Sequence, residues 1–75
     1  MSVTNLGLLL ILYDVGRATA NELAKIMASK PVIVREQLTR FEERGLTTTT
    51  TVEGKRTHLL TGEARKIING VLGYE

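Results

Sequence analysis

The positions of the apolar residues predict four helices and one β-hairpin. Apolar side chains recur at helical spacing over residues 6–15, 20–28, 31–44 and 62–72. Residues 46–60 differ, because β-branched residues fill nearly every position up to Val52, Glu53-Gly54 supplies a turn, and the chain then returns as a second strand. The pattern therefore predicts an α+β, mainly α domain over residues 1–75, with two helices joined by a tight turn and a hairpin before the last helix.

The first predicted helix is apolar on all sides. Only Gly7 interrupts a run of leucine, isoleucine and tyrosine from Leu6 to Tyr13. A helix that is hydrophobic all round is buried all round, and a domain of this size covers only one face of it. We therefore expect the other face to contact a second copy, the alternative being a strongly apolar core helix in a monomer. The interface candidates on the first and last helices are Leu6, Leu9, Leu10, Tyr13, Ile67, Ile68, Val71 and Leu72.

The second and third helices carry start and stop signals. Thr19 and Glu22 have the spacing of a capping box. Pro31 suits the first helical position, and Gly45 is the residue type that ends a helix. The expected core stripes are Leu23, Ile26 and Met27 on the second helix, and Val34, Leu38 and Phe41 on the third.

Composition narrows the functional classes. The chain has no cysteine and one histidine, His58, and it lacks both paired carboxylates at metal-ligand spacing and a phosphate-binding glycine loop. No enzyme activity, metal or cofactor is therefore expected. The apolar run Leu8–Tyr13 is far shorter than the roughly 20 residues of a membrane span, and no basic residue precedes it as in a signal peptide. We expect a soluble, cytoplasmic protein; its net charge of +2 does not identify a partner.

The order of elements resembles the winged-helix DNA-binding domain, and most closely that of the MarR and ArsR-like regulators of bacteria and archaea. The resemblance rests on Glu22-Leu23-Ala24, on Leu38 with Phe41–Leu46, and on Leu60-Thr61-Gly62-Glu63-Ala64, which is similar to the Leu-Thr-x-x-Gly step after the wing of that family. It implies that residues 31–44 form the recognition helix and that the hairpin 46–60 is the wing. It also implies sequence-specific binding of double-stranded DNA by a small homodimeric transcriptional regulator, a repressor.

The recognition helix carries several candidate DNA contacts. Arg35 lies on its predicted exposed face, where it can hold a guanine through two hydrogen bonds or remain an ordinary solvated arginine. Thr39 and Arg40 lie farther along and are expected to contact phosphates, although Arg40 can equally pair with Glu36 four residues earlier. Lys30, at the head of the helix, is a further phosphate contact because backbone N–H groups point the same way there.

Val32 and Ile33 stand where small polar or basic residues are commoner in the family. They can pack on thymine methyl groups, bind a protein partner or pack beneath the wing, and the sequence does not choose among these. A second departure is Ala28, at a position of the turn where family members often have glycine.

Lys55 and Arg56 resemble the basic wing residues that reach a minor groove or its flanking phosphates in the family. A basic hairpin tip that serves only solubility is the alternative for these two residues.

Two other functions compete with a specific regulator. A winged helix can act as a protein–protein interaction module, which Val32 and Ile33 would suit, or as a sequence-independent DNA-coating protein. Full MarR-type proteins carry extra dimerisation helices that form the effector pocket. Because this chain holds little beyond the winged helix, a small-molecule effector is doubtful.

Overall fold

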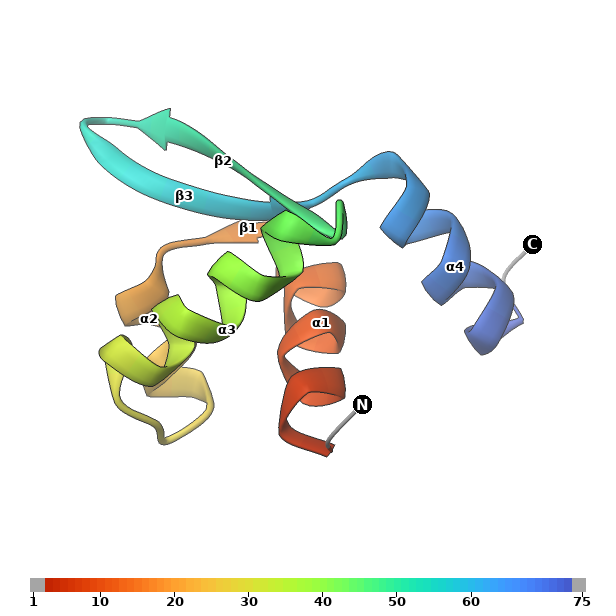
Figure 1. Ribbon diagram of the computed structural model, residues 1–75, viewed down its shortest axis with the longest axis horizontal. Helices are drawn as coiled ribbons and strands as arrows, with labels where there is room; N and C mark the ends of the chain where they lie inside the picture. The colour runs from red at the N-terminus through yellow and green to blue at the C-terminus, as the bar shows by residue number, and fades with distance from the viewer. Residues whose placement is uncertain (1–2, 74–75) are drawn as a thin grey trace.

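The structure, a computed structural model, describes residues 3–73. Over these residues the chain forms α1 (Val3–Val15), β1 (Arg17–Ala18), α2 (Ala20–Ile26), α3 (Pro31–Glu43), β2 (Thr47–Val52), β3 (Lys55–Leu60) and α4 (Gly62–Leu72). Figure 1 shows α1, α2 and α3 together on one side of the sheet, with α4 at the opposite end of the molecule from the hairpin tip. The predicted mainly α winged-helix fold is confirmed.

The sheet is antiparallel with strand order β1-β3-β2. The hairpin β2–β3, here called the wing, pairs from Thr47 opposite Leu60 to Val52 opposite Lys55. The strand β1 pairs with the base of β3, with Arg17 opposite Leu59. No pattern predicted β1, because two residues are too few to show alternation and this strand forms only through its tertiary pairing.

The two residues at the wing tip both have positive φ. Glu53 lies at φ 52° and Gly54 at φ 77°. Type I′ turns require this combination, and their twist matches that of the flanking strands. The Glu53-Gly54 turn therefore sets the register of the wing.

The core lies where α1, α2 and α3 meet beneath the sheet. Its largest fully buried side chains are Leu8, Leu12, Leu23, Val34, Leu38 and Phe41. The predicted stripe on α3 is confirmed, whereas Ile26 was wrongly placed in the core, since it is 55% exposed. The core stripe of α2 instead runs through Ala20, Leu23 and Ala24, with Met27 partly buried beside them. Small alanines let α2 approach its neighbours closely, a role that the periodicity of large side chains does not reveal.

The turn between α2 and α3 explains why α2 is shorter than the predicted range 20–28. Ala28 adopts φ 53°, its N–H donates to Lys25 O at 3.3 Å, and the Ser29 N–H donates to Ala24 O at 2.8 Å. These two bonds form a Schellman motif, with Ala28 at the left-handed position that glycine usually occupies.

The same motif ends α3 at Glu43, one residue before the predicted end. Gly45 has φ 75° and donates to Glu42 O at 3.0 Å, while the Leu46 N–H donates to Phe41 O at 2.9 Å. At the other end of the domain, α1 begins at Val3 rather than at Leu6. The apolar run that located this helix starts only at Leu6, because Thr4 and Asn5 separate it from Val3.

Hydrogen bonds hold α4 against the rest of the domain. The Thr61 hydroxyl donates to Gly45 O at 2.8 Å and accepts from the Ala64 N–H at 3.2 Å, so Thr61 is the N-cap of α4. Tyr13 of α1 donates its hydroxyl to Asn69 Oδ1, and the Arg65 guanidinium lies 5.7 Å from the centre of the Tyr13 ring. The position of α4 relative to α1 is therefore defined by polar as well as apolar contacts.

Candidate nucleic-acid interface

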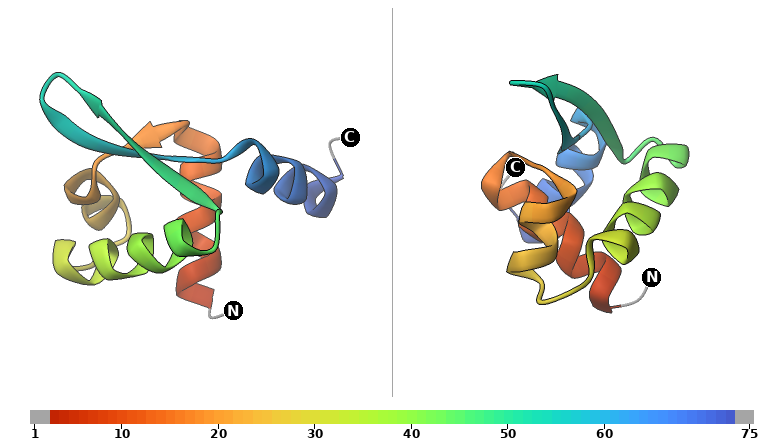
Figure 2. Two further views of the ribbon diagram at one scale, coloured as in Figure 1. Left: turned by 45° about the horizontal axis from the view of Figure 1, so that its top comes forward. Right: turned by 90° about the vertical axis from the view of Figure 1, so that its left-hand side faces the viewer.

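The wing and the helices α2 and α3 enclose a broad, open hollow of about 850 Å³. Figure 2 shows the hairpin standing over α2 and α3. Basic side chains come to this hollow from four elements. We call it the basic hollow, and its lysines and arginines are Arg17, Lys25, Arg35, Lys55 and Arg56. Residues that are 39 positions apart in the sequence, Arg17 and Arg56, thus share one surface.

The structure divides the predicted DNA contacts into two groups. Arg35, Thr39, Lys55 and Arg56 line the basic hollow. Lys30, Val32, Glu36 and Arg40 are also exposed, but they lie on α3 or at its N-cap, outside the lining of the hollow. The hollow therefore joins the middle of α3 to the wing, and the first turn of α3 projects beyond it.

The sequence pattern did not predict two basic residues of the hollow. Arg17 enters through β1, the strand that had no sequence signal, and Lys25 lies on the exposed side of α2. The position of Lys25 in the hollow was predictable from the sequence, because it lies on the exposed face of α2, opposite to the core residues Leu23 and Ala24. Only the fold brings Arg17 to the hollow.

Three glutamates line the hollow, Glu22, Glu42 and Glu53, and the first two are hydrogen-bonded to other parts of the chain. The predicted capping box is confirmed, with Glu22 N donating to Thr19 Oγ1 at 3.1 Å and Thr19 N donating to Glu22 Oε1 at 2.9 Å. The bonds from the Thr19 backbone and side chain lower the pKa of the Glu22 carboxyl, with smaller contributions from Lys55 and Lys25. Glu22 is therefore a capping residue that stays charged beside the lysines.

A second acidic residue, Glu42, links α3 to the wing. The Thr49 hydroxyl donates to Glu42 Oε1 at 3.1 Å and lies 3.4 Å from His58 Nδ1 on the opposite strand. Burial lowers the pKa of His58 and the positive charge of Arg56 lowers it further, while Glu42 acts in the opposite direction. His58 is thus a half-buried, neutral part of the wing, which agrees with a structural role.

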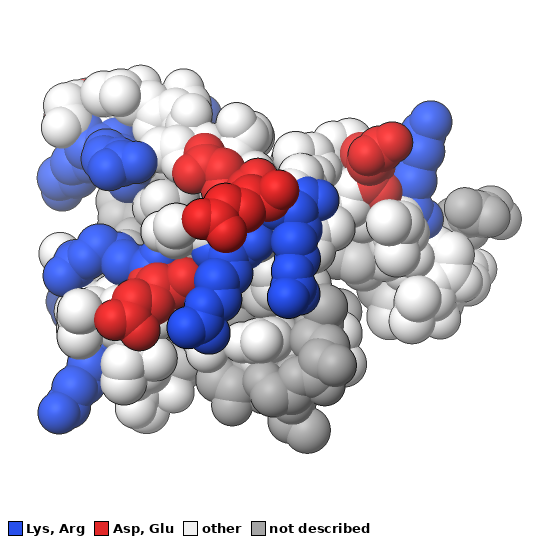
Figure 3. Space-filling model, in the orientation of Figure 1, with Lys and Arg blue, Asp and Glu red and all other residues white. Residues whose placement is uncertain are grey.

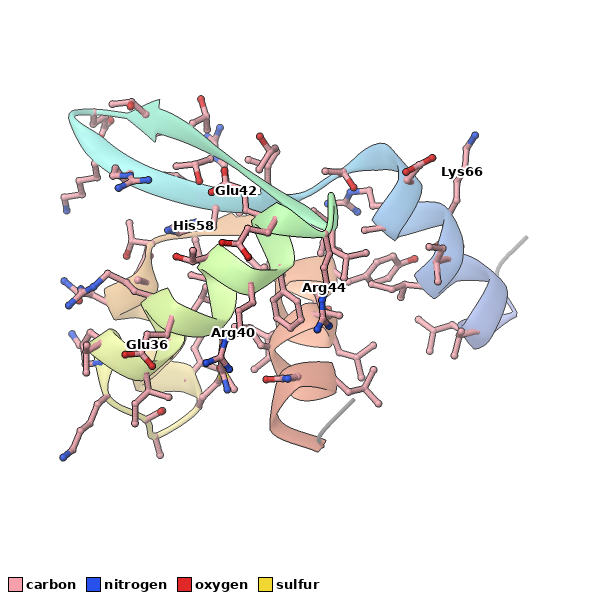
Figure 4. All side chains as sticks on the ribbon, in the orientation of Figure 1. Glu36, Arg40, Glu42, Arg44, His58 and Lys66 are labelled. Atoms are coloured by element: carbon pink, nitrogen blue, oxygen red, sulfur yellow. The ribbon has the colours of Figure 1, made fainter. Side chains whose placement is uncertain are left out.

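The outward face of α3 carries both signs of charge. Figure 3 shows acidic and basic side chains interleaved over this helix, and Figure 4 places Glu36, Arg40, Glu42 and Arg44 along it. Glu43 is exposed at the end of the helix. The positive charge available to a polyanion is therefore concentrated in the basic hollow rather than spread along α3.

Thr39 cannot donate to a phosphate without losing an existing bond. Its hydroxyl donates to Arg35 O at 2.9 Å, one turn earlier in α3. Phosphate oxygens only accept hydrogen bonds. What Thr39 offers a ligand in this arrangement is its methyl group and the remaining lone pair of its oxygen.

Val32 and Ile33 are both exposed, at 51% and 43%. Of the three sequence interpretations, packing beneath the wing is therefore wrong, because the wing lies over the middle of α3 and leaves its first turn uncovered. The two other interpretations, contact with thymine methyl groups and contact with a protein partner, both place these side chains against another molecule.

A second surface feature is an apolar groove between α1 and α4. Its volume is about 140 Å³, and its lining is Leu6, Leu9, Leu10, Leu46, Ala64, Ile67, Ile68 and Val71. Of the predicted interface residues, Leu9 and Ile68 form the buried floor of this apolar groove, while Leu6, Leu10, Ile67, Val71 and Leu72 are large exposed apolar residues. Tyr13 lies partly buried and is occupied by its bond to Asn69.

Within residues 3–73 no three histidine, cysteine, aspartate or glutamate side chains come together as metal ligands would. In the same part of the chain, no helix has the length and apolarity to cross a membrane.

Several solved structures with the same fold are transcriptional regulators. A MarR family transcriptional regulator from Silicibacter pomeroyi is 21% identical, with a TM-score of 0.85 over 96% of this chain and 50% of its own. A MarR-like transcriptional regulator from Thermotoga maritima is also 21% identical, with a TM-score of 0.88 over 97% of this chain and 54% of its own. The winged-helix domain of this chain is therefore similar in fold to about half of each of these MarR-type regulators.

A third such structure is BpsR from Bordetella bronchiseptica, whose DNA binding is regulated by 6-hydroxynicotinic acid. It is 19% identical, with a TM-score of 0.84 over 99% of this chain and 55% of its own. This chain thus spans about half the length of these proteins. BpsR responds to a small molecule, which weighs somewhat against the expectation that an effector is doubtful.

No protein-family model matches the chain, and no curated protein matches it in sequence.

Proposed function

We propose that this protein binds double-stranded DNA, with α3 in the major groove and the wing on the adjacent backbone and minor groove. The observation that carries the proposal is the basic hollow, where Arg35 of the recognition helix and Arg56 of the wing lie on one concave surface. A phosphate backbone that passes between a helix in the major groove and a wing in the minor groove occupies this position. Neutralising its phosphates with lysine and arginine provides the sequence-independent part of the affinity.

The remaining basic residues extend this contact. Arg17 and Lys25 face the backbone from β1 and α2, and Lys30 lies at the start of α3, where no side chain caps the helix. At this end of α3, Pro31 has no N–H and the Ile33 N–H donates to Lys30 O at 3.1 Å, so the attraction for a phosphate rests on the charge of Lys30 and on the helix dipole. Arg35 is the base-reading residue in this arrangement, through two hydrogen bonds to a guanine.

A homodimeric regulator agrees with the second surface feature. The apolar groove with its exposed neighbours Ile67 and Val71 lies on α1 and α4, away from the basic hollow. The domain is 33 Å along its longest axis. Two copies joined end to end at α4 by a two-fold axis have their centres about one such length apart, which is of the same order as the roughly 34–36 Å between half-sites one helical turn apart. The operator should then be approximately palindromic, and occupancy of such a site near a promoter represses transcription.

The same proposal places the protein in the cytoplasm with the DNA and assigns it no catalytic step.

The test is a selection from random duplexes followed by binding measurements on the enriched sequence over a range of salt concentrations. Arg35→Ala should lower affinity and relax the preference at one base pair, by roughly 1–3 kcal/mol. Arg56→Ala should weaken binding to all sequences and reduce the salt dependence. Lys66→Ala is the matched control, because Lys66 is an exposed lysine on α4, far from the hollow (Figure 4).

Failure to enrich a motif, together with unchanged binding in the Arg35 and Arg56 variants, refutes the proposal. Steep salt dependence without any sequence preference indicates a DNA-coating protein instead.

A protein-binding module is the second candidate, and the carboxylates of α3 favour it. Glu36, Glu42 and Glu43 all lie on the helix that would enter the major groove. Such a module binds no duplex, specific or random, at physiological salt. The salt series therefore separates it from both DNA-binding alternatives.

A further inference from the structure

The first turn of α3 presents an apolar side chain where the recognition helix would meet the edges of bases. Val32 is 51% exposed and is followed by Arg35 and Thr39, three and seven residues later, so the three side chains form one stripe along the helix. This stripe continues into the basic hollow, which Arg35 and Thr39 line. Ile33 is turned about 100° away from it.

Along this stripe, apolar groups lie on both sides of the Arg35 guanidinium. Val32 carries two methyl groups and no polar atom. Thr39 has committed its hydroxyl hydrogen to Arg35 O at 2.9 Å, so its methyl group and a lone pair are what remain for a ligand. In the major groove, the only apolar group on a base edge is the C5 methyl of thymine.

We infer that α3 recognises thymine methyl groups beside the guanine held by Arg35, an inference that rests on the proposed function. Val32 and Thr39 are about 10 Å apart along the helix axis, from the rise of 1.5 Å per residue. This span corresponds to about three base pairs at 3.4 Å each. The recognised half-site therefore contains a guanine with thymine on at least one side, and the methyl group itself is part of the contact.

Replacing single thymines by deoxyuridine in the selected duplex tests this inference, because the substitution removes only the methyl group. At the contacted thymine, affinity for the wild-type protein should fall about fourfold, the effect of burying one methyl-sized group. Deoxyuridine elsewhere in the duplex should change affinity little. The protein is unaltered in this comparison, so its folding does not enter the result.

Two protein variants assign the contact to residues. Val32→Ala should bind the thymine duplex more weakly and lose the difference between thymine and deoxyuridine at its base. Thr39→Ser should do the same at its own base, since it keeps the hydroxyl bond to Arg35 O and lacks only the methyl group. Ile26→Ala, which shortens an exposed apolar side chain on α2, is the control and should retain both differences.

The outcomes separate this inference from the proposed function. A selected motif that binds equally well with thymine or deoxyuridine at every position overturns the inference alone. Discrimination that persists in both Val32→Ala and Thr39→Ser also overturns it. Enrichment of no motif overturns the inference, and it refutes the proposed function as well when binding by the Arg35→Ala and Arg56→Ala variants is also unchanged.

Discussion

The Thr49 hydroxyl donates a hydrogen bond to Glu42 Oε1 at 3.1 Å and so connects the first strand of the wing to the last turn of α3. The two elements that would contact DNA are therefore coupled directly, rather than only through the core. The same Glu42 side chain lines the basic hollow, where it offsets part of the positive charge.

Thr49→Val should lower the free energy of unfolding by about 0.5–1 kcal/mol, because one hydrogen bond is lost while shape and strand propensity are kept. For a domain of this size the melting temperature falls by about 2–8 °C. Calorimetry measures the change. Thr50→Val is the control, since Thr50 is an exposed threonine of the same strand; an equal decrease in that variant would contradict the role assigned to Thr49.

Ala28→Gly should stabilise the protein. Ala28 occupies the left-handed C′ position of the Schellman motif at φ 53°, where an L side chain costs roughly 1 kcal/mol relative to glycine. Denaturant unfolding should show a gain of about 1 kcal/mol in the variant. Ala28→Val should be destabilising, because a β-branched residue is still less compatible with positive φ. A loss of stability in Ala28→Gly would contradict the geometry of this turn.

Glu22→Gln should change how stability depends on pH. The pKa of Glu22 is lowered in the folded state from its ordinary value of 4.5 by the hydrogen bonds of Thr19, so its charged form stabilises the fold. This contribution is fully present above the unfolded pKa and disappears as pH falls through the lowered folded pKa. Glutamine keeps the capping geometry without a charge.

Melting temperatures measured from pH 7 to pH 2 should therefore show wild type above Glu22→Gln near neutrality, with the difference shrinking below pH 4.5. A difference that is independent of pH would show that the charge of Glu22 does not contribute.

Ile67→Glu should convert a dimer into a monomer in sedimentation velocity at micromolar concentration. Ile67 is 60% exposed and lines the apolar groove between α1 and α4, so a buried charge there is unpaired in a two-fold interface. Val15→Glu is the matched control, as Val15 is an exposed valine of α1 outside the apolar groove. A wild-type monomer under these conditions would refute the dimer.

The sequence predicted the fold well, because the large apolar residues of α3 and the capping signals at Thr19 and Gly45 act locally. It failed where the structure depends on small residues or on distant pairing. On the core side of α2, Ala20 and Ala24 rather than Ile26 accompany Leu23, and β1 exists only through its pairing with β3.

The candidate site was predictable to a similar extent. Arg35, Lys55 and Arg56 follow from the positions of the recognition helix and the wing. Arg17 requires the sheet to bring it there, and the bond that commits the hydroxyl of Thr39 depends on a side-chain rotation that the order of residues does not specify.

The pairing of β1 has a mechanical consequence for the wing. β1 supports β3 only at His58 and Leu59, so the segment from Lys55 to Thr57 pairs with β2 alone. The hairpin is therefore held in a three-stranded sheet only at its base, and its outer half has strand pairing on one side alone, so the outer half bends more easily than the base. In the proposed DNA complex, the tip would then adjust to grooves of different widths while the root holds its position relative to α3.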